Sequence, residues 1–222
     1  MVHDVDVLDS FDRKIAPGNA ALIVVDVQND FCADEGVFAK AGNDVSMAQE
    51  MLPNLRRLID GARAAGVQVI FVQGIYDPVY LPAPWYERNT RLNFEVPRCI
   101  SGTWGADFYG VAPLESETIV RKHRYSAFVN TELDLILRSR QIRTVITTGV
   151  ATNIRVESTS RDAFMRDYYV ALVDDASAAY SREQHQAALM NISIGFGVVT
   201  KVDEILKSWA QYAGNKQKAK WG

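Results

Sequence analysis

The chain has 222 residues, of which 48% are hydrophobic and 23% are charged, and its formal net charge is −3. This length fits one domain with a substantial buried core. The slightly acidic balance gives no support for a nucleic-acid partner, and no apolar run reaches the roughly 20 residues that a membrane-spanning helix needs. We therefore expect a protein that binds neither nucleic acid nor a membrane.

The N-terminal sequence and the cysteine content bear on where the protein resides. The N-terminus is acidic and lacks the basic and then apolar segments of a secretory signal peptide. The two cysteines, Cys32 and Cys99, are far apart and have neither the spacing of a metal site nor that of a disulfide framework. We therefore expect a cytoplasmic protein.

Apolar runs alternate with amphipathic segments along the chain. Residues 20–25 form a continuous apolar run that ends at Asp26, which is typical of a buried parallel strand. The spacing predicts a helix over residues 45–65 and a second strand over residues 67–72. The next segment, residues 74–117, is rich in proline, glycine and aromatic residues, and we expect a long functional loop there.

The second half of the chain continues this alternation. Four more strands are predicted, at residues 118–121, 144–148, 169–173 and 198–201. Helices are predicted at residues 131–140, about 153–166, from Ser181 onward, and 202–212. Buried strands joined by helices imply right-handed crossovers. The prediction is therefore a three-layer α/β/α, Rossmann-like domain around a parallel sheet of about six strands.

The same pattern suggests how the chain is divided and whether it holds a cofactor. We predict an N-terminal extension, a single domain and a basic polar tail, at residues 1–19, 20–213 and 214–222. No glycine-rich dinucleotide fingerprint follows the first predicted strand. We therefore expect no nucleotide and no other cofactor.

Charged residues close two of the predicted strands. Asp26 follows the first strand and Lys122 the third. Ligands of open parallel sheets bind at the carboxyl ends of the strands. Either residue alone is explained by a structural ion pair, whereas the two together at this edge favour a functional site. Asp26 is then a candidate general base, and Lys122 a candidate for stabilising negative charge.

Arg155 stands near the start of a predicted helix, where its surroundings favour an anion. A turn of small residues leads from a strand into a helix that begins near Asn153. A side chain in the first helical turn faces unpaired backbone N–H groups and the positive end of the helix dipole. Arginine conflicts with that environment and can act neither as a nucleophile nor as a base. The constellation therefore lacks a nucleophile.

Three segments have a distinctive order and spacing: VVDVQNDF at residues 24–31, KHRYSAF at 122–128 and GVATNIRVESTSRDA at 149–163. Together they resemble the isochorismatase-like hydrolases, specifically the cysteine amidohydrolase branch, over residues 20–201. The second and third segments are most similar to ureidoacrylate and biuret-type amidohydrolases. The resemblance implies the isochorismatase-like form of the three-layer fold and hydrolysis of a C–N bond in a small ureido or carbamoyl amide.

The resemblance also implies roles for individual residues. It implies an Asp–Lys–Cys triad at Asp26, Lys122 and position 155, in which a thiolate attacks the carbonyl and the aspartate passes its proton to the leaving amine. It places an oxyanion hole at the backbone of Ala151 and residue 155, and a cis peptide bond between Val150 and Ala151. Arg155 departs from this pattern at the nucleophile.

Arg155 has three competing explanations. In the first, the chain is an amidohydrolase silenced at its nucleophile. In the second, it is a cysteine-independent hydrolase of vinyl ethers of the isochorismatase type, although Arg155 would crowd the pocket of such an enzyme. In the third, Lys122 and Arg155 clamp a small anion in a non-catalytic protein. Cys32 is disfavoured as a relocated nucleophile because the helix N-terminus would not point at it. We expect Arg155 to pair with Asp26 and to lower its pKa, since an uncompensated buried guanidinium is costly.

The remaining expectations concern the substrate pocket, a bound metal ion and the oligomeric state. Trp104 lies in the long segment and is a candidate to cover the cleft, although core packing is an equal alternative for the aromatic candidates. Nicotinamidases hold zinc with an aspartate–histidine pair after the second strand; this sequence has no histidine there, so we expect no metal. The resemblance also implies a homodimer or homotetramer and a small-molecule substrate. The candidate lining residues are Asn29, Phe31, Gln73, Tyr76, Trp85 and Trp104.

Overall fold

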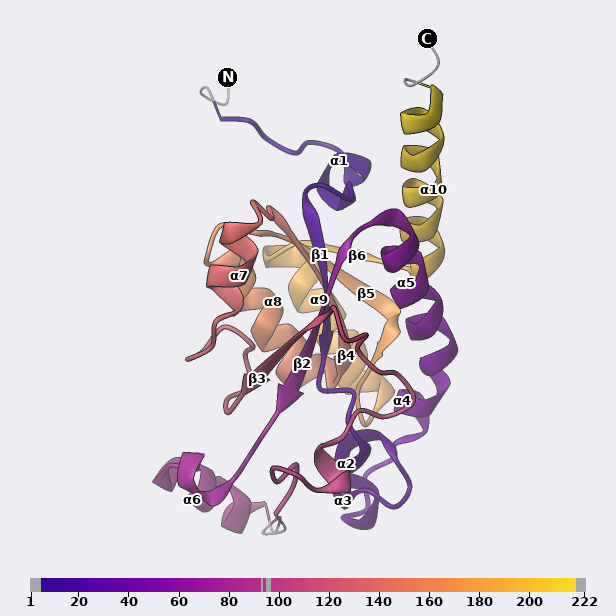
Figure 1. The fold of residues 1–222 in the computed structure, drawn as a ribbon. Coiled ribbons are helices and arrows are strands. Elements are labelled where there is room, and N and C mark those ends of the chain that lie inside the picture. The colour runs from indigo at the N-terminus through magenta and orange to yellow at the C-terminus, as the bar shows by residue number, and fades with distance from the viewer. Residues whose placement is uncertain (1–4, 93, 95–96, 219–222) are drawn as a thin grey trace.

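A six-stranded parallel sheet organises the fold, with strand order β3-β2-β1-β4-β5-β6 (Figure 1). A computed structural model describes residues 5–92, 94 and 97–218 of the chain. The predicted three-layer α/β fold is confirmed. The strands are β1 (Ala20–Val25), β2 (Gln68–Gly74), β3 (Thr118–Lys122), β4 (Thr144–Val150), β5 (Tyr169–Ala178) and β6 (Val198–Thr200).

Helices cover both faces of the sheet (Figure 1). One face carries α4 (Ser46–Glu50), α5 (Leu52–Ala65) and α10 (Val202–Lys218). The other carries α7 (Leu133–Ser139), α8 (Glu157–Phe164) and α9 (Arg182–Gly195). Short helices precede these: α1 (Phe11–Ile15), α2 (Asn29–Cys32) and α3 (Val37–Lys40). None of the helices described is long and apolar enough to cross a membrane.

Two apolar cores lie on opposite sides of the sheet. Val24 faces the first core with Leu55 of α5 and Trp209 of α10. Ile23 faces the second core with Leu137 of α7. Successive residues of β1 thus enter different cores, and all six are buried. This double coverage is why the strand is a continuous apolar run in the sequence.

Three predicted helices have other boundaries in the structure. The helix expected over about residues 153–166 is a π-helical turn at residues 152–156 followed by α8. The helix expected over residues 45–65 is two helices, α4 and α5, which meet at Met51. Pro53 lies in the first turn of α5, where its missing N–H is tolerated, but it would break a continuous helix. α10 continues to Lys218 through Gly214, beyond its expected end at residue 212. Of the predicted tail, residues 214–218 are therefore helical, and 219–222 lie outside the described residues.

The segment after β2 is more ordered than the predicted loop. It contains the helix α6 (Ala83–Arg91) and the short turns η1 (Pro78–Tyr80) and η2 (Trp104–Ala106). Proline in the first turn of α6 favours the start of this helix, so the prolines of the segment do not indicate a loop there. Figure 1 shows α6 beyond the carboxyl end of β2, away from the sheet. The η2 turn of this segment lies at the carboxyl ends of β1 and β2, where Gln28 and Gln73 both donate to the carbonyl of Ala106.

Candidate active site

The carboxyl ends of three strands bring Asp26, Lys122 and Arg155 together. Asp26 follows β1, Lys122 ends β3, and Arg155 lies in the π-helical turn η3 (Thr152–Val156) after β4. Lys122 Nζ lies 2.6 Å from Asp26 Oδ2, and Arg155 Nε lies 3.2 Å from the same oxygen. All three side chains are buried. π-helical turns occur often at functional sites, and this one follows a strand next to the buried ion pair.

Asp26 has an unusual backbone conformation and a half-satisfied carboxylate. Its φ is +50°, a left-handed conformation that costs a non-glycine residue roughly 1 kcal/mol or more. Oδ1 is buried and has no hydrogen-bond partner. Burial raises the pKa of Asp26, although the charges of Lys122 and Arg155 oppose this change. The expected pairing with Arg155 is present, but the expected lowering of the pKa is wrong because desolvation of a fully buried carboxyl outweighs both cations.

The turn between β4 and η3 depends on close backbone packing. Gly149 has φ +119°, and a Cβ atom there would lie 2.0 Å from the carbonyl oxygen of Val25. Only glycine can therefore stand at this position. The next peptide bond, Val150–Ala151, is cis in the structure.

The carbonyl of Ala151 collects the first N–H groups of the turn. The backbone N–H groups of Ile154, Arg155 and Val156 donate to this oxygen over 3.1, 2.9 and 3.2 Å. The N–H of Arg155, one of the two predicted oxyanion donors, is thus already engaged in this conformation. Ala151 remains the predicted donor at the turn.

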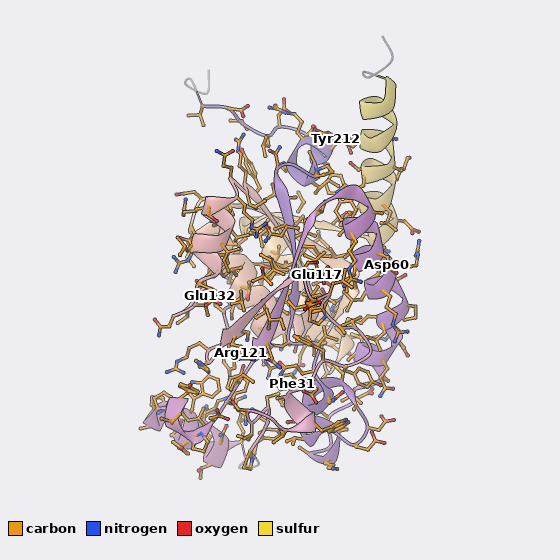
Figure 2. All side chains as sticks on the ribbon, viewed as in Figure 1. Phe31, Asp60, Glu117, Arg121, Glu132 and Tyr212 are labelled. Atoms are coloured by element: carbon orange, nitrogen blue, oxygen red, sulfur yellow. The ribbon has the colours of Figure 1, made fainter. Side chains whose placement is uncertain are left out.

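The guanidinium of Arg155 is enclosed by aromatic rings. Its Cζ lies 3.9 Å from the ring centroid of Phe31 and 5.5 Å from that of Phe38. Tyr76 and Tyr180 interact with its charge from other elements. Figure 2 labels Phe31 at the end of the sheet where α2 and α3 gather. Cation–π contacts in a desolvated place contribute about 2 kcal/mol, so these rings stabilise the buried guanidinium.

The other predicted lining residues divide into two groups. Phe31 and Tyr76 surround the Arg155 guanidinium and are almost completely buried. The side-chain amide of Asn29 donates to the carbonyl of Trp104 over 2.7 Å, and that of Gln73 donates to the carbonyl of Ala106 over 2.9 Å. These amides hold the η2 turn in place. Trp104 is exposed, and it contacts Asn29 through its backbone carbonyl.

Neither cysteine has the environment of a nucleophile. Cys32 and Cys99 are both buried. Burial raises the pKa of Cys32 to about 12 and that of Cys99 well above its ordinary value. Both therefore remain protonated thiols, and nucleophilic attack needs a thiolate. Within the described part of the chain, no group of three or more His, Cys, Asp or Glu side chains is arranged to hold a metal ion.

Gln28 and Asp30 are important residues that sequence reasoning missed. The side chain of Gln28 donates to the carbonyls of Gly74 and Ala106 over 3.0 and 2.8 Å and accepts from the N–H of Gly74. Asp30 Oδ2 accepts from the backbone N–H of Cys99 over 2.6 Å. Both residues lie in the same VVDVQNDF segment as Asp26. Polar residues inside an otherwise buried segment were the signal that could have identified them.

Arg98 is a third residue that the sequence analysis overlooked. Its side chain is buried, and its guanidinium lies over the rings of Phe94, Tyr76 and Trp85 at 5.0, 5.7 and 5.9 Å. Burial lowers the pKa of Arg98, and the charges of Arg155 and Arg88 lower it further. The site thus carries more positive charge than its triad alone suggests.

Known proteins are similar to this chain in sequence and in fold. The model of the isochorismatase domain family matches residues 20–204. The ureidoacrylate amidohydrolase RutB of Stutzerimonas stutzeri is 40% identical over 204 residues, which cover 86% of this chain and 82% of that protein. Two crystal structures are also similar. A cysteine hydrolase from Pseudomonas syringae pv. phaseolicola has a TM-score of 0.78 at 28% identity and covers 90% of this chain and 96% of its own. An N-carbamoylsarcosine amidase from Thermoplasma acidophilum has a TM-score of 0.67 at 26% identity, with coverages of 83% and 97%.

Proposed function

The chain belongs to the isochorismatase domain family, and from this premise we propose that its site is that of an amidohydrolase for small ureido or carbamoyl compounds. The observation that carries the proposal is the buried pair of Asp26 and Lys122 beside position 155 at the start of a helix. Two of the similar proteins, a ureidoacrylate amidohydrolase and an N-carbamoylsarcosine amidase, are named as enzymes that hydrolyse amides.

The proposed chemistry requires a cysteine at position 155. Its thiolate would attack the carbonyl carbon, and the thiol proton would pass through Asp26 to the nitrogen of the breaking C–N bond. Water would then hydrolyse the thioester and restore the thiol. Lys122 donates to Oδ2 of Asp26, which leaves the unpartnered Oδ1 for the proton transfer. The backbone N–H of Ala151 is the proposed oxyanion donor.

Arg155 prevents this chemistry in the chain as it stands. Its guanidinium stays protonated, contacts Asp26 and lies against Phe31, so that both the nucleophile and the space for a substrate are missing. We therefore propose an amidohydrolase silenced at its nucleophile. The test is ammonia release from ureidoacrylate, biuret and a simple carbamoyl amide by the chain and by its Arg155→Cys variant. Turnover by the unmodified chain would instead support a cysteine-independent mechanism.

One observation supports a second candidate function, the binding of a small anion without turnover. Lys122 and Arg155 share the single carboxylate of Asp26, and Nε and Nη1 of Arg155 are buried without a hydrogen-bond partner. A bound carboxylate or phosphate could satisfy such donors. Calorimetric titration of the unmodified chain with acetate and with inorganic phosphate tests this candidate. Micromolar binding together with an inactive Arg155→Cys variant would favour it over the silenced amidohydrolase.

A further inference from the structure

A cavity of about 290 Å³ adjoins the Arg155 site. Tyr76 is shared between the two, because it lines the cavity and also interacts with the charge of Arg155. Tyr76 is held near the ends of β2 and β3, where the N–H of the preceding Ile75 donates to the carbonyl of Lys122. Arg98 and Asn89 also line the cavity.

Arg98 supplies the positive charge of this cavity. Its side chain is only 5% exposed, and its Nε is buried without a hydrogen-bond partner. Its hydrogen bond to a side chain is a long one of 3.4 Å to the amide oxygen of Asn89. Among the residues that the structure describes, no carboxylate forms an ion pair with Arg98. A buried guanidinium without an anionic partner is costly, so the site is suited to an anion brought by a ligand.

The surroundings of Arg98 orient it and do not neutralise it. The rings of Tyr76, Trp85 and Phe94 lie against the guanidinium within 6 Å. Stacking of this kind occupies the faces of the guanidinium and leaves its N–H edge for a planar, bidentate acceptor. The nearby charges of Arg155 and Arg88 are also positive. A carboxylate, which is planar and anionic, matches this environment in both charge and shape.

We propose that the cavity binds the carboxylate of the substrate through Arg98, so that the site accepts ureido or carbamoyl derivatives of carboxylic acids in preference to neutral amides. This inference rests on the proposed amidohydrolase function. The carbamoyl end would lie towards position 155 and the acid end towards Arg98, with Tyr76 between them. Arg98 is then a specificity-determining residue that takes no part in bond cleavage.

The test compares an anionic with a neutral substrate in the Arg155→Cys variant. The two substrates are ureidoacrylate and its carboxamide, which differ at the acid group alone. Arg98→Gln should lower kcat/KM for ureidoacrylate about 100-fold, mainly through KM, and change kcat/KM for the carboxamide less than about threefold. Arg98→Lys should recover part of the loss, because the charge returns without the bidentate edge. Arg91→Gln, which alters an exposed arginine of α6, is the matched control and should change neither value.

Equal losses for the two substrates, or no loss for either, would overturn the carboxylate site. Calorimetric titration of Arg155→Ala, which opens the space at position 155 without supplying a thiol, and of the double variant Arg155→Ala, Arg98→Gln with ureidoacrylate gives a readout without turnover. If Arg155→Cys is inactive while binding is weakened at least tenfold by Arg98→Gln, the amidohydrolase proposal fails and the anion site stands. If Arg155→Cys is inactive and Arg155→Ala does not bind ureidoacrylate, both proposals fail. Thermal unfolding of each variant shows whether a loss comes from misfolding.

Discussion

Lys122 donates a hydrogen bond of 2.6 Å to Asp26 inside a pair that is completely shielded from solvent. The two residues are 96 positions apart and meet because β1 and β3 end at the same edge of the sheet. Lys122 also donates to the carbonyl of Arg124 over 3.0 Å. The pair is therefore held in position independently of Arg155, which approaches the same aspartate oxygen from η3.

Arg155→Cys should create amidohydrolase activity. We expect ammonia release from a ureido or carbamoyl amide to rise at least about 10³-fold over the unmodified chain, because a nucleophile is supplied beside an intact acid–base pair. Arg155→Ala is the matched control: it opens the same space without a thiol and should remain inactive. The double variant Arg155→Cys, Asp26→Asn should also be inactive. Equal rates for the alanine and cysteine variants would show that the role assigned to position 155 is wrong.

Lys122→Met should destabilise the fold. Removing one partner of a buried ion pair costs about 3–5 kcal/mol because a charge is left uncompensated. In this chain Arg155 still contacts Asp26, so we expect the free energy of unfolding to fall more in the Arg155→Cys background than in the unmodified chain. Urea unfolding of the four proteins in this cycle measures the difference. Arg138→Met, which breaks a largely exposed pair with Asp134, should cost less than about 1 kcal/mol.

Cys32 should resist alkylation in the native protein. At its ordinary pKa of 9.0, roughly one thiol in ten is ionised at pH 8, whereas at a pKa of about 12 the fraction is roughly one in 10⁴. Raising the pH should therefore increase the reaction rate steadily up to about pH 12. Mass spectrometry after treatment with iodoacetamide checks this, with urea-unfolded protein as the control. Rapid alkylation of Cys32 in the folded protein at pH 8 would contradict this prediction and would support Cys32 as a nucleophile.

Gly105→Ala should disturb the loop that covers the site. A Cβ atom at this position would lie 2.2 Å from a carboxylate oxygen of Asp30, which also accepts the backbone N–H of Cys99. Overpacking of this kind costs about 1–3 kcal/mol. Gly18→Ala is the matched control, because nothing lies within 4 Å of the new atom, and its effect should be close to zero or slightly stabilising. The unfolding midpoints of the two variants are compared. Equal midpoints would contradict this account of the loop.

The sequence alone determined the layered fold and the location of the candidate site. β1 is apolar along its whole length, and the alternation of apolar runs with amphipathic segments allowed all six strands to be predicted. Strands of one parallel sheet end at a common edge, so charged residues that close them, such as Asp26 and Lys122, were expected to meet there. The same local pattern exposed the conflict at Arg155, since a helix N-terminus disfavours a cation.

Only the tertiary structure decided how these charges are accommodated. The contact of Arg155 with Phe31, the raised pKa of Asp26 and the burial of Arg98 depend on side chains that are distant in sequence. The spacing of apolar residues in the sequence does not show how strongly an ionisable group is desolvated, because desolvation depends on all the atoms packed around that group. The order of the segment after β2 likewise depends on tertiary contacts, such as the hydrogen bonds of Gln28 and Gln73 to the carbonyl of Ala106, whereas its prolines and aromatic residues had suggested a loop.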